Sequence, residues 1–316
     1  MQNVSVGERV LVTGGTGTLG GELVPALLRR GASVTVLSRD ENKQGELAKV
    51  WQRGVRWILG DVRDATVCRD AVRDQDLVIH AASLKYVDRS EIETGAYASV
   101  NIGGTAAILD ACLSERSVRR VVGISTDKAC DPINAYGMTK ALLEKMFMEA
   151  QYRRRAEGGA DFTVCRYGNV IGSRGSVVLR WQDALRKGLP IKVTDQEMTR
   201  FFFTVQDAVS LIDATIAQPG GAIVSFAMPS ARLGDLASLW SPDYEILGPR
   251  PGEKTHEGLI SEREMPFTFA TDDGVLIMRP FGMYPARRPA WPRYDSEMAR
   301  RITGAELAEL TAGWRS

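Results

Sequence analysis

The sequence predicts an α/β protein with a doubly wound parallel sheet and a smaller C-terminal lobe. Short apolar runs alternate with segments of helical periodicity through the first 170 residues, a glycine-rich loop joins the first run to the first helix, and the alternation breaks up from residue 171 onward. We expect residues 1–170, completed by about 203–228, to form the sheet domain, and 171–202 with 229–316 to form the lobe.

The amino-acid composition limits the classes of partner and the cellular compartment that we expect for this protein. The 316 residues are 44% hydrophobic and 25% charged, and the net charge of +1 gives no reason to expect nucleic acid or an anionic membrane. Four cysteines lie far apart with no C-x-x-C pair, which predicts no metal site, no disulfides and a reducing compartment. No leader and no apolar stretch of roughly 18 residues is visible, so the expected location is the cytoplasm.

The first element is an apolar strand at residues 9–13, followed at once by a glycine loop. Gly14, Gly17 and Gly20 form G-x-x-G-x-x-G, and helical spacing begins after them. Glycines in this context permit a tight turn and the close approach of a pyrophosphate to the helix N-terminus. The pattern predicts a dinucleotide site on a Rossmann sheet.

The end of the second strand, residues 32–37, bears on the choice of dinucleotide. An acidic residue about 20 positions beyond the glycine loop would hold the free ribose hydroxyl of NAD. Here Ser38 and Arg39 follow the strand, with Lys43 nearby, and these groups suit a 2′-phosphate. The sequence favours NADP, and Asp40 keeps NAD as the alternative.

The third and fourth strands are expected at residues 55–59 and 77–80. Asp61 follows the third strand, where it can reach an adenine edge or simply cap the next helix. Ala81 and Ala82 are small enough for the fourth strand end to lie against a cofactor, and Lys85 can reach a phosphate or sugar hydroxyl. His80 is interpreted as structural.

The fifth strand, residues 121–124, leads into the stretch on which the functional prediction depends. Tyr136 and Lys140 lie one helical turn apart and share a face, and a tyrosine whose pKa is lowered by an ammonium can act as a general base. Thr126, Asp127 and Lys128 add a hydroxyl, a carboxyl and an amine at the same strand end.

Beyond Lys140 the pattern predicts a helix to about residue 156, a sixth strand at 162–167, a helix at 205–217 and a last sheet strand at 222–226. The apolar helix around residues 146–148 suits either an oligomer interface or the core. Residues 248–257 form a charged Pro/Gly-rich loop, in which a surface turn and a binding loop are both open interpretations.

These motifs together resemble the extended short-chain dehydrogenase/reductases, and among them the bacterial UDP-N-acetylglucosamine 4,6-dehydratases of capsular polysaccharide biosynthesis. The resemblance covers nearly the whole chain. Cys130 and Asp131 depart from that pattern, in which Val or Ala and then Asn are usual. The matching segments are residues 13–20, 38–40, 80–85, 125–140, 168–170, 173–178, 198–201, 250–254, 256–257, 294–296 and 306–307.

The resemblance implies an intramolecular redox dehydration of a UDP-sugar with a tightly bound, recycled NADP. Tyr136, activated by Lys140 and assisted by Thr126, would take the C4 hydroxyl proton while hydride leaves C4. A neutral Lys128, its pKa lowered by burial and nearby cations, would take the C5 proton, and protonated Asp127 would release the C6 hydroxyl as water. Lys128 could also reprotonate C5 with inversion.

The predicted binding residues fall into two sets. Charge suggests that Arg250 and Arg174 clamp the diphosphate, that Asn169 holds a diphosphate or sugar oxygen, and that Glu253 holds the ribose or orients Arg250. The full cofactor set is Gly14, Thr16, Gly17, Thr18, Leu19, Gly20, Ser38, Arg39, Asp61, Val62, Ala81, Ala82, Lys85, Asn101, Tyr136 and Lys140. The full substrate set is Lys85, Asn169, Arg174, Ser176, Val177, Arg200, Arg250 and Glu253.

Two other functions stay open at this point. A UDP-hexose 4-epimerase shares the first hydride step but needs neither Asp127 as acid nor Lys128 as base. A non-catalytic NADP-binding protein would have no use for Thr126, Tyr136 and Lys140 together. The resemblance also implies a homo-oligomer.

Overall fold

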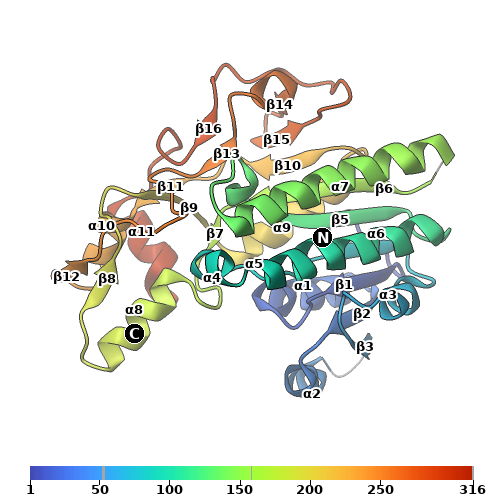
Figure 1. Ribbon diagram of the computed structural model, residues 1–316, viewed down its shortest axis with the longest axis horizontal. Coiled ribbons are helices and arrows are strands. Elements are labelled where there is room, and N and C mark those ends of the chain that lie inside the picture. The colour runs from blue at the N-terminus through green and yellow to red at the C-terminus, as the bar shows by residue number, and fades with distance from the viewer. Residues whose placement is uncertain (52–53, 158, 315–316) are drawn as a thin grey trace.

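The computed structural model describes residues 1–51, 54–157 and 159–314, and it is built around one large twisted sheet (Figure 1). Its strand order is β14-β15-β10-β6-β5-β4-β1-β2-β3. The strands from β3 to β10 pair in parallel, and the reversal of order beside β1 and β4 creates a switch point where ligands bind in such sheets. The sheet strands are β1 (Arg9–Thr13), β2 (Ser33–Ser38), β3 (Val55–Leu59), β4 (Leu77–His80), β5 (Arg120–Thr126), β6 (Asp161–Tyr167), β10 (Ile223–Phe226), β14 (Thr268–Ala270) and β15 (Val275–Met278).

Helices cover both faces of the sheet, as the alternating sequence pattern predicted. Leu23 and Leu27 of α1 pack with Ile212 of α9 on one face, and Cys68 of α3, Ile108 of α6 and Phe147 of α7 pack on the other. The central strands are buried on both sides, which explains their continuous Val, Ile and Leu content. The helices of this domain are α1 (Thr18–Arg29), α2 (Glu41–Val50), α3 (Ala65–Val72), α4 (Val87–Ile92), α5 (Thr94–Tyr97), α6 (Gly104–Ser114), α7 (Ala135–Glu157) and α9 (Val205–Ile216), with a π-helical turn Ala98–Gly103 and a 3-10 turn Asp127–Ala129.

A smaller lobe lies beside the carboxyl ends of the strands and is built from short elements (Figure 1). Trp181, Met198 and Phe202 belong to its own hydrophobic core. Its elements are β7 (Asn169–Val170), β8 (Ile191–Val193), β9 (Thr199–Phe203), β11 (Ser230–Arg232), β12 (Tyr244–Ile246), β13 (Gly258–Ile260), β16 (Tyr294–Asp295), α8 (Val177–Arg186), α10 (Leu233–Ser238) and α11 (Gly304–Thr311), with 3-10 turns Met265–Phe267 and Ala312–Trp314.

Two expectations about the sheet are corrected. The strand predicted at residues 222–226 is present as β10, but it is not the last, because β15 pairs antiparallel with β10 and β14 pairs antiparallel with β15. Part of the segment 229–316 therefore belongs to the sheet domain rather than to the lobe. The alternating βα pattern could not reveal these strands, because a chain that returns antiparallel needs no crossover helix.

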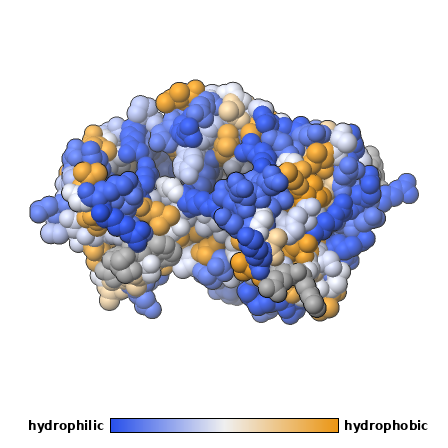
Figure 2. All heavy atoms as spheres, turned by 90° about the horizontal axis from the view of Figure 1, so that it is seen from below, coloured by the Kyte–Doolittle hydropathy of each residue, from blue (hydrophilic) through white to orange (hydrophobic). Residues whose placement is uncertain are grey.

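One helix contradicts the expectation that no segment is long and apolar enough to span a membrane. The continuous helical segment Thr94–Ser114 meets that criterion by length and composition, but half of it is buried inside the protein, as is typical of a core helix. On the face shown in Figure 2, hydrophobic residues are scattered in small groups among hydrophilic ones. Residues 146–148, which suited either an interface or the core, belong to the core: Phe147 and Met148 are buried, and Phe147 lies against Gly123 of β5.

A buried ion-pair network ties the lobe to the sheet. The guanidinium of Arg166 on β6 is 1% exposed and pairs with both Glu144 of α7 at 2.6 Å and Glu264 of the C-terminal segment at 2.8 Å. Arg166 also donates to the carbonyl of Leu259 at 2.7 Å, and the hydroxyl of Ser125 donates to Glu144 at 2.6 Å. The network thus connects three elements with the strand end that carries the predicted catalytic residues.

Candidate active site

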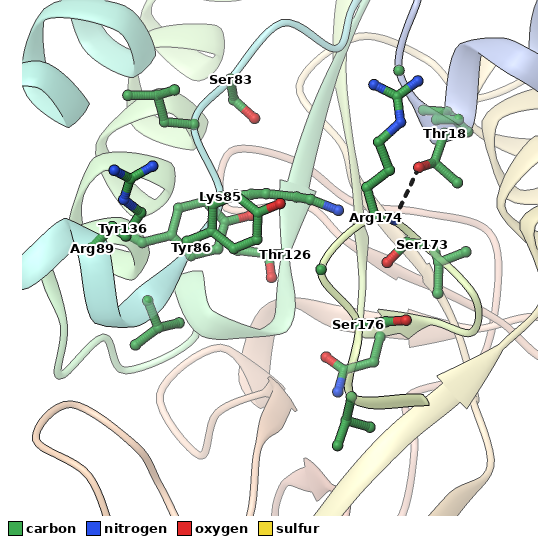
Figure 3. Close-up of a pocket in the computed structure, with 18 of the residues that line it drawn as sticks. Thr18, Ser83, Lys85, Tyr86, Arg89, Thr126, Tyr136, Ser173, Arg174 and Ser176 are labelled. Carbon is green, nitrogen blue, oxygen red and sulfur yellow. Dashed lines mark hydrogen bonds between the residues drawn. The ribbon is translucent and has the colours of Figure 1, made fainter. Parts of the chain in front are cut away.

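A single large cavity runs from the carboxyl ends of β1, β2 and β4 to the lobe. Its volume is about 1740 Å³, enough for more than one ligand group. The two parts of the site that the sequence predicted, the glycine loop and the segment around Tyr136, both line this cavity. Residues of α8 and of the loop at 250–253 line it as well. Figure 3 shows Tyr136, Tyr86 and Arg89 on one side and Arg174, Ser173 and Ser176 on the other.

The glycine loop leaves no room for side chains. A Cβ at Gly14, where φ is +69°, would lie 2.9 Å from the backbone of Ala82, and a Cβ at Gly20 would lie 2.0 Å from the carbonyl oxygen of Gly15. Gly20 does not line the cavity but lets α1 pack closely on the strand end. The cradle therefore fits the phosphates of a dinucleotide at the N-terminus of α1.

The residues that follow β2 are those expected near the ribose of a bound dinucleotide. Ser38, Arg39 and Lys43 line the cavity, but the hydroxyl of Ser38 already accepts from Gln44 at 2.9 Å. Asp40 caps α2 and is paired with Lys43, whose ammonium lowers the pKa of the carboxyl. Arg39 is half-exposed and lies 3.5 Å from Asp61, so it is the guanidinium best placed for a phosphate.

Two predicted cofactor contacts do not reach the cavity. Asp61 is held by Arg63 at 2.7 Å, and this hydrogen bond lowers the pKa of its carboxyl to about 2. Asn101, in the π-helical turn, is fully buried and bonds both backbone groups of Leu84 as well as the hydroxyl of Thr139. Asn101 therefore fixes the loop that bears Lys85, which is a correction to its predicted role as a cofactor ligand.

His80 is a structural residue, as expected. Its ring nitrogens lie 2.9 Å from the hydroxyl of Thr13 and 3.1 Å from that of Thr105, and burial lowers the pKa of the imidazole to about 3. Lys85, in contrast, lines the cavity with its chain directed across it toward the loop of Arg174 (Figure 3). Partial desolvation and the nearby Arg174 lower the pKa of its amine.

The segment after β5 brings a carboxyl and an amine into contact. Asp127 is completely buried and does not line the cavity; its Oδ1 accepts from the hydroxyl of Thr126 at 2.9 Å and from Lys128 at 3.1 Å. Its Oδ2 is buried without a hydrogen-bond partner in the described part of the chain. Burial raises the pKa of Asp127, which is the direction of shift that a proton donor at this position requires.

The pKa of Lys128 is shifted in the direction opposite to the predicted one. Burial alone would lower the pKa of Lys128, but the carboxylates of Asp127 and Glu257, at 3.1 and 3.2 Å from Nζ, outweigh burial and raise it. The prediction of a lowered pKa was wrong, because the lysine meets two anions rather than cations. The ammonium form is therefore the stable one in this arrangement.

The tyrosine also departs from the prediction. Burial raises the pKa of Tyr136 to about 12, and the cation that opposes this rise is Lys128 rather than Lys140. Lys140 is itself buried, which lowers the pKa of its amine to about 8. Both shifts have one cause, since a phenolate and an ammonium each lose hydration in the same enclosed pocket.

Arg174 lies at the glycine loop. Its guanidinium donates to the carbonyl of Thr16 at 2.8 Å, and its backbone amide donates to the hydroxyl of Thr18 at 3.2 Å, the contact drawn in Figure 3. A Cβ at the next residue, Gly175, would lie 2.2 Å from the ring of Tyr86. The loop at 173–176 therefore crosses the cavity between the glycine loop and Tyr86.

The remaining predicted substrate residues lie on the lobe side of the same cavity. Arg250 and Glu253 share one turn, in which the amide of Glu253 donates to the carbonyl of Arg250 at 3.2 Å, and Oε2 of Glu253 has no partner among the described residues. Arg200 on β9 is buried, and Asn169 extends from β7. All four line the cavity, together with Ser176 and Val177.

Comparison with known proteins decides the family of this chain. Residues 10–278 match the family described as polysaccharide biosynthesis protein. The chain belongs to this family. An inverting UDP-N-acetylglucosamine 4,6-dehydratase of Campylobacter jejuni is 38% identical over 277 residues, which are 85% of this chain and 82% of the relative. A UDP-glucose 4-epimerase of Rickettsia rickettsii is 33% identical over 273 residues, covering 82% of this chain and 80% of the relative.

Solved structures share the fold of this chain. Pen from Bacillus thuringiensis has a TM-score of 0.90 and 31% identity, covering 98% of both chains. DesIV, a dTDP-glucose 4,6-dehydratase from Streptomyces venezuelae with NAD and TYD bound, has a TM-score of 0.70 and 24% identity over 78% of this chain and 86% of its own. The latter likeness shows the fold, an extended Rossmann sheet with a smaller lobe.

Sequence reasoning missed one charged residue of this family member's site. Glu257 is 3% exposed, lines the cavity and contacts Lys128, although it comes from a loop far along the chain. The signals were its place at the end of the charged loop 248–257 and in the matching segment 256–257, and neither of them gave this residue a role. Trp181 and Phe202 of the lobe core also line the cavity, which no sequence pattern predicted.

Proposed function

We propose that this protein is an NADP-dependent dehydratase that converts UDP-N-acetylglucosamine to a 4-keto-6-deoxy sugar. The observation that carries the proposal is the contact between Asp127 and Lys128, 3.1 Å apart, at the wall of the cavity that Lys128 shares with Tyr136 and the glycine cradle. An acid and a base in one pair are what a water elimination needs in addition to a redox step. The Campylobacter jejuni relative carries the same activity in its name.

Tyr136 and Lys140 serve the redox half of the reaction. Oxidised NADP, when bound, supplies the hydride acceptor and a positive charge in this pocket. Tyr136 takes the proton of the C4 hydroxyl, and Thr126 beside it orients the same oxygen. Because the pKa of Tyr136 is about 12 in the free protein, its function depends on cations gathered in the filled site.

Lys128 and Asp127 serve the elimination. Transfer of the proton from the Lys128 ammonium to Asp127 leaves the net charge unchanged and gives a neutral amine beside a neutral acid. The amine then takes the C5 proton, which a neighbouring ketone acidifies, while Asp127 gives its proton to the departing C6 oxygen. Lys128 in its ammonium form can also reprotonate C5, which provides for inversion there.

The other binding assignments rest on position and charge. Arg39 and Ser38 favour NADP over NAD, since Asp40 is occupied as a helix cap and by Lys43. Arg250 suits the diphosphate, and the unpartnered carboxylate oxygen of Glu253 suits a ribose hydroxyl. A cytoplasmic location and a homo-oligomer are part of the proposal, and light scattering after size exclusion measures the latter.

The deciding experiment incubates the purified protein with UDP-N-acetylglucosamine without added cofactor, followed by mass spectrometry and proton NMR. We expect the loss of one water and a new C6 methyl doublet, because the cofactor is regenerated in each cycle. An unchanged mass with a new anomeric signal would indicate the alternative, a 4-epimerase, which is the activity in the name of the Rickettsia rickettsii relative. No change after addition of NADP and other UDP-sugars would exclude both enzymes and leave a non-catalytic nucleotide-binding protein.

The contact of Arg174 with the glycine loop predicts a role in cofactor retention. Arg174→Ala removes a charge-assisted hydrogen bond to Thr16 and the guanidinium nearest the cradle. We expect NADP to bind about 10- to 150-fold more weakly, since such bonds contribute roughly 1.5–3 kcal/mol. Titration calorimetry of nucleotide-stripped protein measures this, with Arg186→Ala on the exposed face of α8 as the matched control. Equal affinities in both variants would contradict the role.

A further inference from the structure

Glu257 is a buried carboxylate whose position the proposed function does not yet explain. Its Oε1 lies 3.2 Å from Nζ of Lys128 and 3.9 Å from Nε of Arg200, and its Oε2 is buried with no hydrogen-bond partner among the described residues. Its backbone is held on both sides by Ser296, whose hydroxyl accepts from the amide of Glu257 and whose amide donates to its carbonyl. The carboxylate is therefore fixed against the amine of Lys128.

Lys128 contacts two carboxyl groups whose pKa values are shifted in opposite directions. Asp127 is fully buried and has a raised pKa because burial disfavours its anion. Glu257 is nearly as buried, but Lys128 and Arg200 outweigh that burial and lower its pKa, so it remains an anion. Asp127 can exchange a proton with Lys128, whereas Glu257 supplies a constant negative charge beside the amine.

This constant charge matters at one step of the reaction. When the neutral Lys128 takes the C5 proton, the electrons of the C5–H bond form the C5–C6 double bond. The C6–O bond breaks, and the hydroxyl leaves as water with the proton of Asp127. The products on the protein are an ammonium and the Asp127 carboxylate, with Glu257 ionised throughout. The same charges are those of the ion pairs that Lys128 forms with Asp127 and Glu257.

We propose that Glu257 is a positioning residue for proton transfer at C5, holding Nζ of Lys128 in place and stabilising the ammonium that the transfer creates. The proposal rests on the proposed dehydratase function. It requires no contact between Glu257 and the sugar. Preorganised charge of this kind accelerates a step because it is already in place when the charge develops.

The charged and titratable groups around this site define what a pH profile reports. Asp127 and Lys128 come from the 3-10 turn, Arg200 from β9, Lys254 from the preceding loop and Tyr136 from α7. Removal of the Glu257 charge lowers the pKa at which the Asp127–Lys128 pair loses the proton that the two residues share. That proton is then lost at lower pH, so the alkaline limb of kcat moves downward.

The test compares Glu257→Gln with the wild-type protein, both loaded with NADP and given UDP-N-acetylglucosamine. Glu297→Gln, at an exposed carboxylate of the same lobe, is the matched control. In Glu257→Gln we expect formation of the dehydrated sugar and deuterium uptake at C5 to fall about 10²-fold. We expect KM to change little and absorbance at 340 nm to rise on substrate addition, because the first hydride transfer continues while elimination stalls.

Glu257→Asp keeps the charge but shortens its reach, so it should restore the alkaline limb and part of the rate. A Glu257→Gln variant with an unchanged rate and alkaline limb, beside an active wild type, would overturn the role of Glu257 alone. Equal loss of hydride transfer and elimination in a folded, NADP-binding Glu257→Gln would also overturn it, because that result indicates a general structural defect. A wild type that forms no dehydrated sugar would instead overturn the proposed function, and this role with it.

Discussion

Lys128→Met should stop the elimination while leaving the first redox step intact. The variant removes the amine that takes the C5 proton but keeps a side chain of similar length in the space beside Asp127 and Glu257. General acid–base groups contribute about 10²–10⁴-fold, so we expect kcat for dehydration to fall about 10³-fold. Stopped-flow absorbance at 340 nm should show reduced cofactor forming and persisting, and proton NMR should show no methyl doublet.

Lys145→Ala, at an exposed lysine of α7, is the control and should behave as wild type. The result also separates the two enzyme classes, because a 4-epimerase returns hydride to C4 and needs no base at Lys128. A Lys128→Met variant that still released water at the wild-type rate would contradict the assignment of Lys128. In that case Glu257, the other group at this position, becomes the candidate base.

Arg166→Met should cause the largest loss of stability. The change leaves the buried carboxylate of Glu144 and the partly buried carboxylate of Glu264 without the cation that pairs with both of them. Breaking one partner out of a buried ion pair costs about 3–5 kcal/mol, because the remaining charges stay desolvated. We expect urea unfolding at pH 8 to show a loss of this size, and Arg119→Met, at an arginine 62% exposed, to lose far less.

The pH dependence of the same variant gives a second check. Burial by itself would raise the pKa of Glu264, but Arg166 lowers that pKa to about 2 in the wild type. The ionised Glu264 therefore stabilises the fold above its unfolded pKa near 4.5. This contribution is lost as the pH falls toward 2. Without Arg166, burial raises the pKa of Glu264 and protonation favours the folded state. The variant should therefore regain part of its stability between pH 8 and pH 5. A loss that did not diminish with falling pH would contradict this explanation.

Part of the site was predictable because its signals are local. The strand and helix around Gly14, Gly17 and Gly20 fix the nucleotide loop, since Gly14 needs a positive φ and Gly17 and Gly20 lie close to Gly14 and Gly15 of the same loop. Tyr136 and Lys140 share a face of α7 because they lie one turn apart. The parallel order of the strands follows from the same local alternation, and with it the meeting of both motifs at one sheet edge.

The protonation states were decided by the tertiary structure. Whether Lys128 meets cations or anions depends on Glu257, a residue of a distant loop whose approach no spacing rule encodes. The pKa of Tyr136 depends on how completely the assembled pocket excludes water. The sequence named the reacting groups correctly as neighbours but assigned two of their shifts the wrong sign.

The same division explains the other corrections. The prediction that Arg174 binds the diphosphate rested on its charge, and only the path of its loop shows that it contacts Thr16 and Thr18. Asn101 has a side chain that could bind a cofactor, but its amide group forms hydrogen bonds with Leu84 and Thr139 instead. By itself the sequence determined the sheet, the nucleotide loop and the set of reactive side chains, because these depend on neighbours along the chain. Their partners, charges and access to the cavity were decided only by the tertiary structure, because burial and long-range contact depend on how distant segments pack together.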